Sequence, residues 1–269
     1  MEEEPGGRPG IEELPDPLLV DVLVLAGARC SPAAALVCQR WRRLALSEPR
    51  LLASLHVPRC SVVERAGATT ASRWRLSDLL ALAHPAALRE LSLCGGASLP
   101  EGSAAHLRRL SCLTSLTLRS LCLEDLPPGV ALTGLRELDL SVNWLEQLPP
   151  ALVAAPCLAL TRLSLSRNHL ASLLARPYLA GLRDLDISLN WFHSLPRSLA
   201  DATSLRRLVL WCGFTSVGWG WSALELSAGD VDHVLARMHT LRTLELRGSR
   251  TPPPVWDHLR RRLPGLQLV

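Results

Sequence analysis

The three asparagines of this 269-residue chain are its most regularly placed chemical groups. Asn143, Asn168 and Asn190 each stand at the ninth residue of a segment that begins L-x-x-L-x-L. A primary amide donates two hydrogen bonds and accepts two, so at a fixed place in a repeat it suits the pairing of backbone groups. The spacing predicts that each amide ties one buried turn of the chain to the next.

Residue types that could carry catalysis do not form a known motif. The eight histidines are isolated, and the chain contains no H-E-x-x-H, no G-x-S-x-G and no phosphate-binding loop. Asp139 and Asp186 fall on repeating surface positions, and His169 and His193 read as solvated loop residues rather than metal ligands. The sequence therefore predicts a protein that is not an enzyme and that holds no cofactor and no metal.

The elements that position the asparagines are nine copies of one pattern. Their first leucines are 22 to 36 residues apart, at Leu52, Leu88, Leu113, Leu135, Leu160, Leu182, Leu205, Leu241 and Leu263. Alternation of leucine with polar residues has the period of a strand rather than of a helix. The pattern resembles the leucine-rich-repeat family. The resemblance implies an α/β fold in which residues 51–269 form a curved solenoid with a parallel sheet on its concave face.

The connections between these strands differ in length. Proline occurs in several of them, as in L-P-P-A-L at 148–152, and favours extended chain or short 3₁₀ turns on the convex side. The two intervals of 36 residues leave room for longer helices, which we expect at 74–83 and 230–238. Asp230 is the expected N-cap of the second of these helices.

Charge and composition limit the classes of partner. All 29 basic residues are arginine, and they are interleaved with acidic residues without aromatic stacking partners, so we expect no nucleic-acid binding. The amino terminus lacks a secretory signal, and the longest apolar stretch, 18–28, is too short to cross a bilayer. The scattered cysteines indicate a reducing compartment. We expect a soluble cytoplasmic or nuclear protein with no membrane partner.

Residues 12–50 carry a second pattern, after a tail at 1–11 that is rich in Glu, Gly and Pro and is expected to be disordered. The run 14–23 reads L-P-D-P-L-L-V-D-V-L, and the run 37–42 reads V-C-Q-R-W-R. This segment resembles the F-box, whose signature begins L-P-x-x-L-L-x-x-I-L and ends V-C-x-x-W-R. In that family the F-box clamps the Skp adaptor of a cullin-RING ubiquitin ligase, while the repeats hold the substrate.

The F-box resemblance implies an adaptor-binding surface. Its residues would be Leu14, Pro15, Leu18, Leu19, Val22, Leu23, Val37, Cys38 and Trp41. The expected function is then that of a non-catalytic substrate receptor, monomeric outside its complex, with a Skp-type adaptor, a cullin and an unknown protein substrate as partners. The alternative is that these helices cap the amino-terminal edge of the solenoid. The chain would then be a leucine-rich-repeat scaffold or regulatory subunit with no ubiquitin role.

The third and fifth residues of each repeat should point outward from the sheet. In the middle repeats these positions carry the four carboxylates of Glu137, Asp139, Asp184 and Asp186. Such a strip can be the ordinary solvation of a sheet face, or it can meet a basic segment of a protein partner.

Further along the chain, arginine and tryptophan replace the acidic residues. Arg207 and Trp211 precede a glycine-rich stretch that contains Trp219 and Trp221. Tryptophan and arginine are enriched at binding hot spots, so we include all four residues in the predicted substrate-binding surface. The alternative is that Trp219 and Trp221 fold back and seal the core at this irregular repeat.

Overall fold

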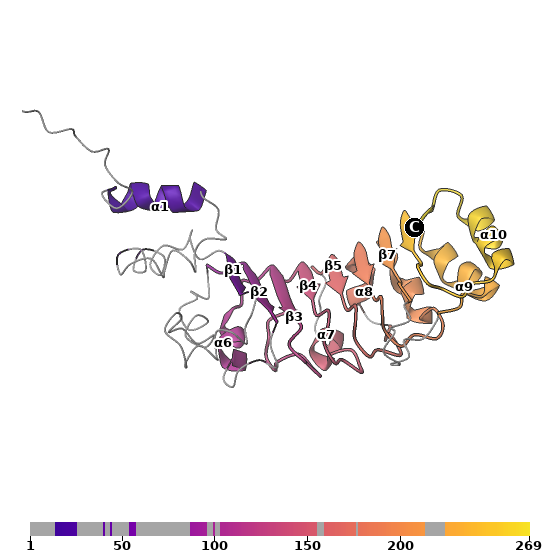
Figure 1. The fold of residues 1–269 in the computed structure, drawn as a ribbon, viewed down its shortest axis with the longest axis horizontal. Helices are drawn as coiled ribbons and strands as arrows, with labels where there is room; N and C mark the ends of the chain where they lie inside the picture. Colours follow the sequence, from indigo (N-terminus) through magenta and orange to yellow (C-terminus); the bar gives the residue numbers. More distant parts are fainter. Residues whose placement is uncertain are drawn as a thin grey trace, which may run out of the picture.

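Nine parallel strands in sequence order form the single sheet of the described residues (Figure 1). The computed structural model describes residues 14–25, 40, 44, 54–57, 87–95, 99, 103–154, 159–175, 177–212 and 224–269. The strands are β1 (Ser54–Val57), β2 (Glu90–Cys94), β3 (Ser115–Arg119), β4 (Glu137–Asp139), β5 (Arg162–Ser164), β6 (Asp184–Asp186), β7 (Arg207–Val209), β8 (Thr243–Glu245) and β9 (Gln267–Leu268). This arrangement confirms the predicted α/β solenoid with a parallel sheet.

Short helices return the chain between successive strands (Figure 1). They are α6 (Ser103–Arg109), α7 (Pro150–Ala154), α8 (Tyr178–Gly181), η3 (Arg197–Asp201), α9 (Ala228–His233), η4 (Leu235–Arg237) and α10 (Pro253–Arg262), where η marks a 3₁₀ helix. The middle connections are thin, as the prolines predict, since Pro150 begins α7 and Pro196 immediately precedes η3. A further helix, α1 (Asp16–Leu25), lies beyond β1 (Figure 1). None of the helices described has the length and apolar character needed to cross a membrane.

Leucines at equivalent positions stack into one continuous core. The fourth residue of each of the first eight repeats is paired in register, from Leu55 through Leu91, Leu116, Leu138, Leu163, Leu185 and Leu208 to Leu244. Leu244 then pairs with Leu268, the sixth residue counted from Leu263, so the predicted start of the last repeat was two residues too early. The buried cluster extends from Leu55 to Leu259. Each fully buried leucine contributes about 1.5 to 3 kcal/mol of hydrophobic free energy. The same register confirms that the third and fifth residues of the repeats form two columns on the opposite face of the sheet, here called the concave face.

The asparagine amides join neighbouring turns, as their spacing predicts. Asn168 is fully buried; its Nδ2 donates to the carbonyls of Leu140 at 3.0 Å and Leu165 at 2.9 Å, and its Oδ1 accepts from the Leu145 amide at 3.1 Å. The same carbonyl of Leu140 also accepts from Nδ2 of Asn143 at 2.9 Å. Each carbonyl between two asparagines is therefore shared by the amide of its own repeat and that of the next.

A left-handed residue precedes each asparagine and was not foreseen from the sequence. The φ angle is 59° at Val142, 56° at Arg167 and 54° at Leu189. This conformation costs an L-residue roughly 1 to 2 kcal/mol, and it is least favourable for a β-branched side chain such as valine. The strained residue turns the chain out of the strand, so that the asparagine side chain points into the core beneath the turn.

The long connection between β7 and β8 forms helix as predicted, but its cap differs. The N-cap is Ser227, whose Oγ accepts from the Asp230 amide at 3.1 Å, while Oδ2 of Asp230 accepts from the Ser227 amide at 2.8 Å. The prediction of Asp230 as N-cap was wrong, because this carboxylate stands at the third helical position and completes a capping box. The predicted helix at 74–83 and the tail at 1–11 lie outside the described residues.

Asn168→Ala should destabilise the solenoid strongly. The change leaves the buried Leu145 amide without its acceptor and removes one donor from each of two buried carbonyls, which should lower the free energy of unfolding by about 3 kcal/mol. Chemical and thermal denaturation followed by circular dichroism would measure this. Asp201→Ala, at an exposed side chain on the convex side, should change stability by less than about 0.5 kcal/mol. Equal stabilities of the two variants would contradict the structural role of the amide.

Candidate functional site

The concave face carries a shallow hollow over strands β3 to β7. Its volume is about 310 Å³. The lining residues include five of the predicted substrate-binding residues, namely Glu137, Asp139, Asp184, Asp186 and Arg207. The structure therefore brings these side chains onto one surface, as their positions in the repeats predict.

Arg162 lies between two of the carboxylates and was not part of the predicted site. Its Nη1 is 3.2 Å from Oε1 of Glu137, and its Nε is 3.5 Å from Oδ2 of Asp184. All three side chains are well exposed, so water and salt weaken these ion pairs to about 0 to 1 kcal/mol each. The sequence could have predicted these ion pairs, because Arg162 is the third residue of its repeat and both neighbouring repeats carry an acidic residue at that position. The strip keeps an excess of negative charge and has one built-in counter-ion that a partner could displace.

The two aspartates of the strip also hold the turns that follow their strands. Oδ1 of Asp139 accepts from the Ser141 amide at 2.8 Å, and Oδ1 of Asp186 accepts from the Ser188 amide at 3.0 Å. The second carboxylate oxygen of each aspartate has no hydrogen-bond partner among the described residues. Asp139 and Asp186 are thus fixed in orientation by one oxygen and present the other on the concave face.

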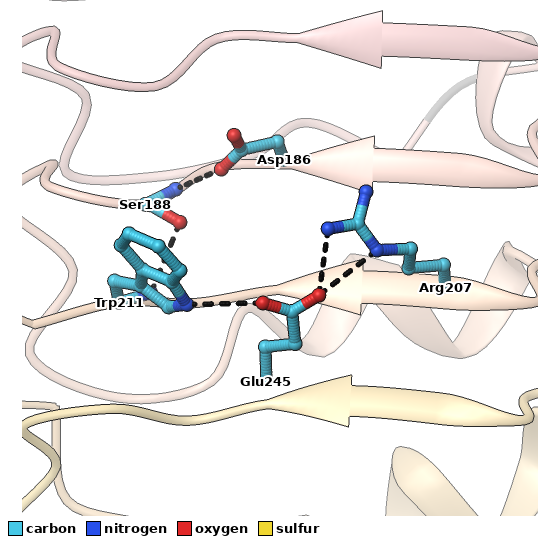
Figure 2. A network of polar contacts seen from close by, with 5 residues as sticks. All are labelled: Asp186, Ser188, Arg207, Trp211 and Glu245. Atoms are coloured by element: carbon cyan, nitrogen blue, oxygen red, sulfur yellow. Dashed lines mark hydrogen bonds and ion pairs between the residues drawn. The ribbon is translucent and has the colours of Figure 1, made fainter. Parts of the chain in front are cut away.

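Glu245 organises the carboxyl-terminal part of the concave face, as Figure 2 shows. This residue is only 7% exposed. Its Oε1 accepts from Nε and Nη2 of Arg207 at 2.9 and 2.6 Å, and its Oε2 accepts from Nε1 of Trp211 at 3.3 Å. A largely buried carboxylate needs such partners, because its desolvation is otherwise unfavourable. Glu245 therefore holds Arg207 and Trp211 in place, although it was not part of the predicted site.

Trp211 is held on several sides yet remains 39% exposed. Its backbone amide donates to Oγ of Ser188 at 3.0 Å (Figure 2), and the guanidinium carbon of Arg247 lies 5.0 Å from the ring centroid. A fixed, partly exposed indole can be buried by a partner with little loss of conformational freedom. Trp219 and Trp221, the other predicted tryptophans, lie outside the described residues.

The predicted adaptor-binding residues are described in part. Leu18 is 53% exposed on α1 and Pro15 is exposed, whereas Leu14 is half-buried and Leu19 is fully buried. Of these four residues, Leu18 and Pro15 are accessible to solvent, whereas Leu19 is not. The side chains of the remaining predicted residues, Val22, Leu23, Val37, Cys38 and Trp41, lie outside the described set.

Arg40 connects α1 to the later part of the same segment. Its Nε donates to Oδ1 of Asp16 at 2.8 Å, and its guanidinium also donates to the Leu14 carbonyl. Leu19, Val20 and Leu44 are buried but do not belong to the continuous core of the solenoid.

Two features of the described side chains bear on metal binding and on nucleophilic attack. They contain no group of three or more His, Cys, Asp or Glu residues that could hold a metal ion. Burial raises the pKa of the Cys212 thiol, more than the backbone hydrogen bond from Leu224 lowers it. The thiol is therefore protonated near neutral pH and is a weak nucleophile. The prediction that the chain is not an enzyme stays a prediction.

Removing Arg207 should destabilise the protein more than removing Arg162. Both arginines occupy the third position of a repeat, but Arg207→Ala leaves the largely buried Glu245 without its cation, at a cost of about 2 kcal/mol. Arg162→Ala leaves exposed carboxylates and should change the free energy of unfolding by less than about 0.5 kcal/mol. Denaturation of both variants measures the difference.

A third variant tests the cause of that difference. In a Glu245→Gln background, Arg207→Ala should lose most of its effect, because the uncharged amide needs no cation. An unchanged effect in that background would assign the cost to lost packing of the arginine instead.

Comparison with known proteins bears on the fold. No family model matches the chain, and no curated protein matches it in sequence. Among solved structures, a leucine-rich-repeat protein of Leptospira interrogans is similar with 22% sequence identity and a TM-score of 0.52, over 72% of this chain and 45% of that one. The leucine-rich-repeat ectodomain of the Arabidopsis thaliana membrane receptor kinase GASSHO1/SCHENGEN3, in complex with CASPARIAN STRIP INTEGRITY FACTOR 2, has 21% identity and a TM-score of 0.47, over 72% of this chain and 24% of that one. The described part of the chain therefore has the leucine-rich-repeat fold, and it spans less than half of either protein.

Proposed function

We propose that this chain is a non-catalytic receptor that holds a protein partner on its concave face. The observation that carries the proposal is the hollow over β3 to β7, where the oriented carboxylates of Asp139 and Asp186 share one exposed surface with Arg162 and Arg207. A sheet face that is broad, polar and shallow suits a protein surface better than a small molecule, which usually needs an enclosed apolar cavity.

The negative charge of the concave face favours a partner with a basic segment. Asp139, Asp186 and the Glu137–Arg162–Asp184 group leave the strip with more negative than positive side chains. A basic segment of the partner would replace Arg162 as counter-ion and gain the exposed carboxylate oxygens of the two aspartates. Such an association is steered by charge and weakens as salt is added.

The more specific role that we propose is that of a substrate receptor in a Skp-cullin-F-box ubiquitin ligase. Its support is the pattern L-P-x-x-L-L at 14–19 together with V-C-x-x-W-R at 37–42. In addition, α1 exposes Leu18 while it buries Leu19 and Val20, which gives the helix one side for packing and one apolar residue for a partner. The receptor would act as a monomer with the adaptor and cullin, in the cytoplasm or nucleus.

Two variants should separate the two proposed surfaces. Leu18→Ala in the full chain should weaken binding to a purified Skp adaptor by about 2 kcal/mol, roughly 30-fold, while the concave face keeps its partner. Asp186→Arg should weaken binding of the concave-face partner and leave adaptor binding unchanged, because it places positive charge where a basic segment would lie. Affinity purification followed by mass spectrometry measures both effects, and binding of purified adaptor confirms the first.

Matched controls distinguish specific contacts from general damage. Leu174→Ala removes a leucine that is 50% exposed, and Asp201→Arg reverses a charge on the convex side; both should leave adaptor and partner binding unchanged. Absence of adaptor binding by the wild-type chain would overturn the ubiquitin role and leave a leucine-rich-repeat scaffold or regulatory subunit. Partner proteins retained by Asp186→Arg would overturn the role of the concave face.

The absence of lysine predicts weak self-modification within such a ligase. Ubiquitin is joined most readily to a lysine amine, and this chain has none. In a reconstituted ligase, a bound substrate should acquire ubiquitin while the receptor stays largely unmodified. An engineered Arg206→Lys variant, which offers an amine on an exposed side chain, should gain modification. Abundant ubiquitin on the wild-type receptor at sites other than its amino terminus would contradict the prediction.

A further inference from the structure

A column of aromatic residues, two of them exposed and one half-buried, follows the carboxyl ends of the strands in successive repeats. Trp144, His169 and Trp191 each follow a repeat asparagine, and we call this column the aromatic ladder. Trp144 is 53% exposed and Trp191 is 41% exposed. Sequence reasoning treated His169 as a solvated loop residue and did not single out either tryptophan.

The backbone spaces the ladder regularly. The amides of Trp144, His169 and Trp191 donate to carbonyls of the preceding repeat at 2.9, 2.9 and 2.8 Å. The His169 and Trp191 rings consequently lie 4.8 Å apart, centroid to centroid, which is about the spacing of adjacent strands. The backbones of the three residues are thus fixed by bonds to the preceding repeat, and the rings of His169 and Trp191 also contact each other.

A second hollow, of about 500 Å³, lies at the Trp144 end of the ladder. We call it the acidic hollow; its lining residues are Glu124, Asp125, Trp144, Glu146, Gln147, Leu148, Pro150 and His169. The lining contains three carboxylates and no arginine, and none of its residues lines the hollow of the concave face. Glu124 and Glu146 are exposed and have no ion-pair partner among the described residues.

We propose that the acidic hollow binds an arginine side chain of an extended protein segment, with the guanidinium against the indole of Trp144. A guanidinium is planar and weakly hydrated, so it stacks on an indole face while its N–H groups reach nearby carboxylates. Glu146 stands two residues after Trp144, and Glu124 reaches the hollow from the preceding repeat. Arg167 lies on the same repeat as His169 but does not line the hollow. The carboxylates of the acidic hollow therefore have no arginine among the residues that line it with them.

The extended form of the segment follows from the ladder. Trp191 lies one repeat beyond His169, so a chain that places one arginine in the acidic hollow can continue along the aromatic ladder. This surface would act in addition to the concave face, and a partner could use it whether or not the concave face binds a basic segment.

The test uses the full chain carrying Asp186→Arg, which disables the concave strip, and a capped nonapeptide of alternating arginine and glycine. The matched probe replaces each arginine with citrulline, which has the same shape but no charge. Calorimetric titration at low ionic strength should show the arginine peptide binding at least 10-fold more tightly than the citrulline peptide. The indole N–H resonance of Trp144 should shift during the titration.

Substitutions locate the binding. Trp144→Ala should weaken the arginine peptide about 10-fold, Trp144→Phe by less because tryptophan is the best cation–π partner, and Glu146→Gln by several-fold. Leu174→Ala, an equally exposed apolar residue outside the hollow, should have no effect. All four variants should keep the melting temperature of the parent, since these side chains are exposed. Equal binding of the citrulline peptide, or an affinity unchanged by Trp144→Ala and Glu146→Gln, would overturn the proposal.

Discussion

The solenoid depends on the pairing of buried backbone groups beneath each turn. In the middle repeats a left-handed residue turns the chain out of its strand, and this turn leaves carbonyls and amides that no strand neighbour can pair. The amides of Asn143, Asn168 and Asn190 pair them, and the Leu140 and Leu165 carbonyls each accept from two asparagines. The leucine core can be close-packed only because these polar groups are satisfied inside it.

This constraint also decides which side chains reach a partner. Because every turn repeats the same geometry, each position of the repeat becomes a column, and neighbouring charges in a column meet about one strand spacing apart. Arg162 therefore contacts Glu137 and Asp184 on both sides. Asp139 and Asp186 give one oxygen to a turn and leave the other exposed. On the concave face, residues that hold the turns thus also belong to the proposed binding surface.

Periodicity made most of this fold predictable. The spacing of the leucines predicted the strands, the register of all but the last one, and the columns at the third and fifth positions. The spacing of the asparagines predicted their amide contacts. Contacts between distant repeats could not be predicted in the same way. The burial of Glu245, for example, follows from Arg207 and Trp211 lying 38 and 34 residues away in the chain. The aromatic ladder was missed because one residue after each asparagine was treated as loop, although its place in the repeat fixed its neighbours.

Departures from the repeat make the surface differ from one turn to the next. A perfectly regular solenoid would present the same chemistry in every turn and could not distinguish one register of a partner from another. Here the acidic strip ends at β6 and is followed by Arg207 of β7, Trp211 and Glu245 of β8, and the aromatic ladder is defined by the repeats that carry asparagine. The asparagine repeats therefore supply both the rigid frame and the exposed rings. A partner that used the concave strip and the ladder together would be held in one orientation, because it would be fixed at two surfaces that share no residue.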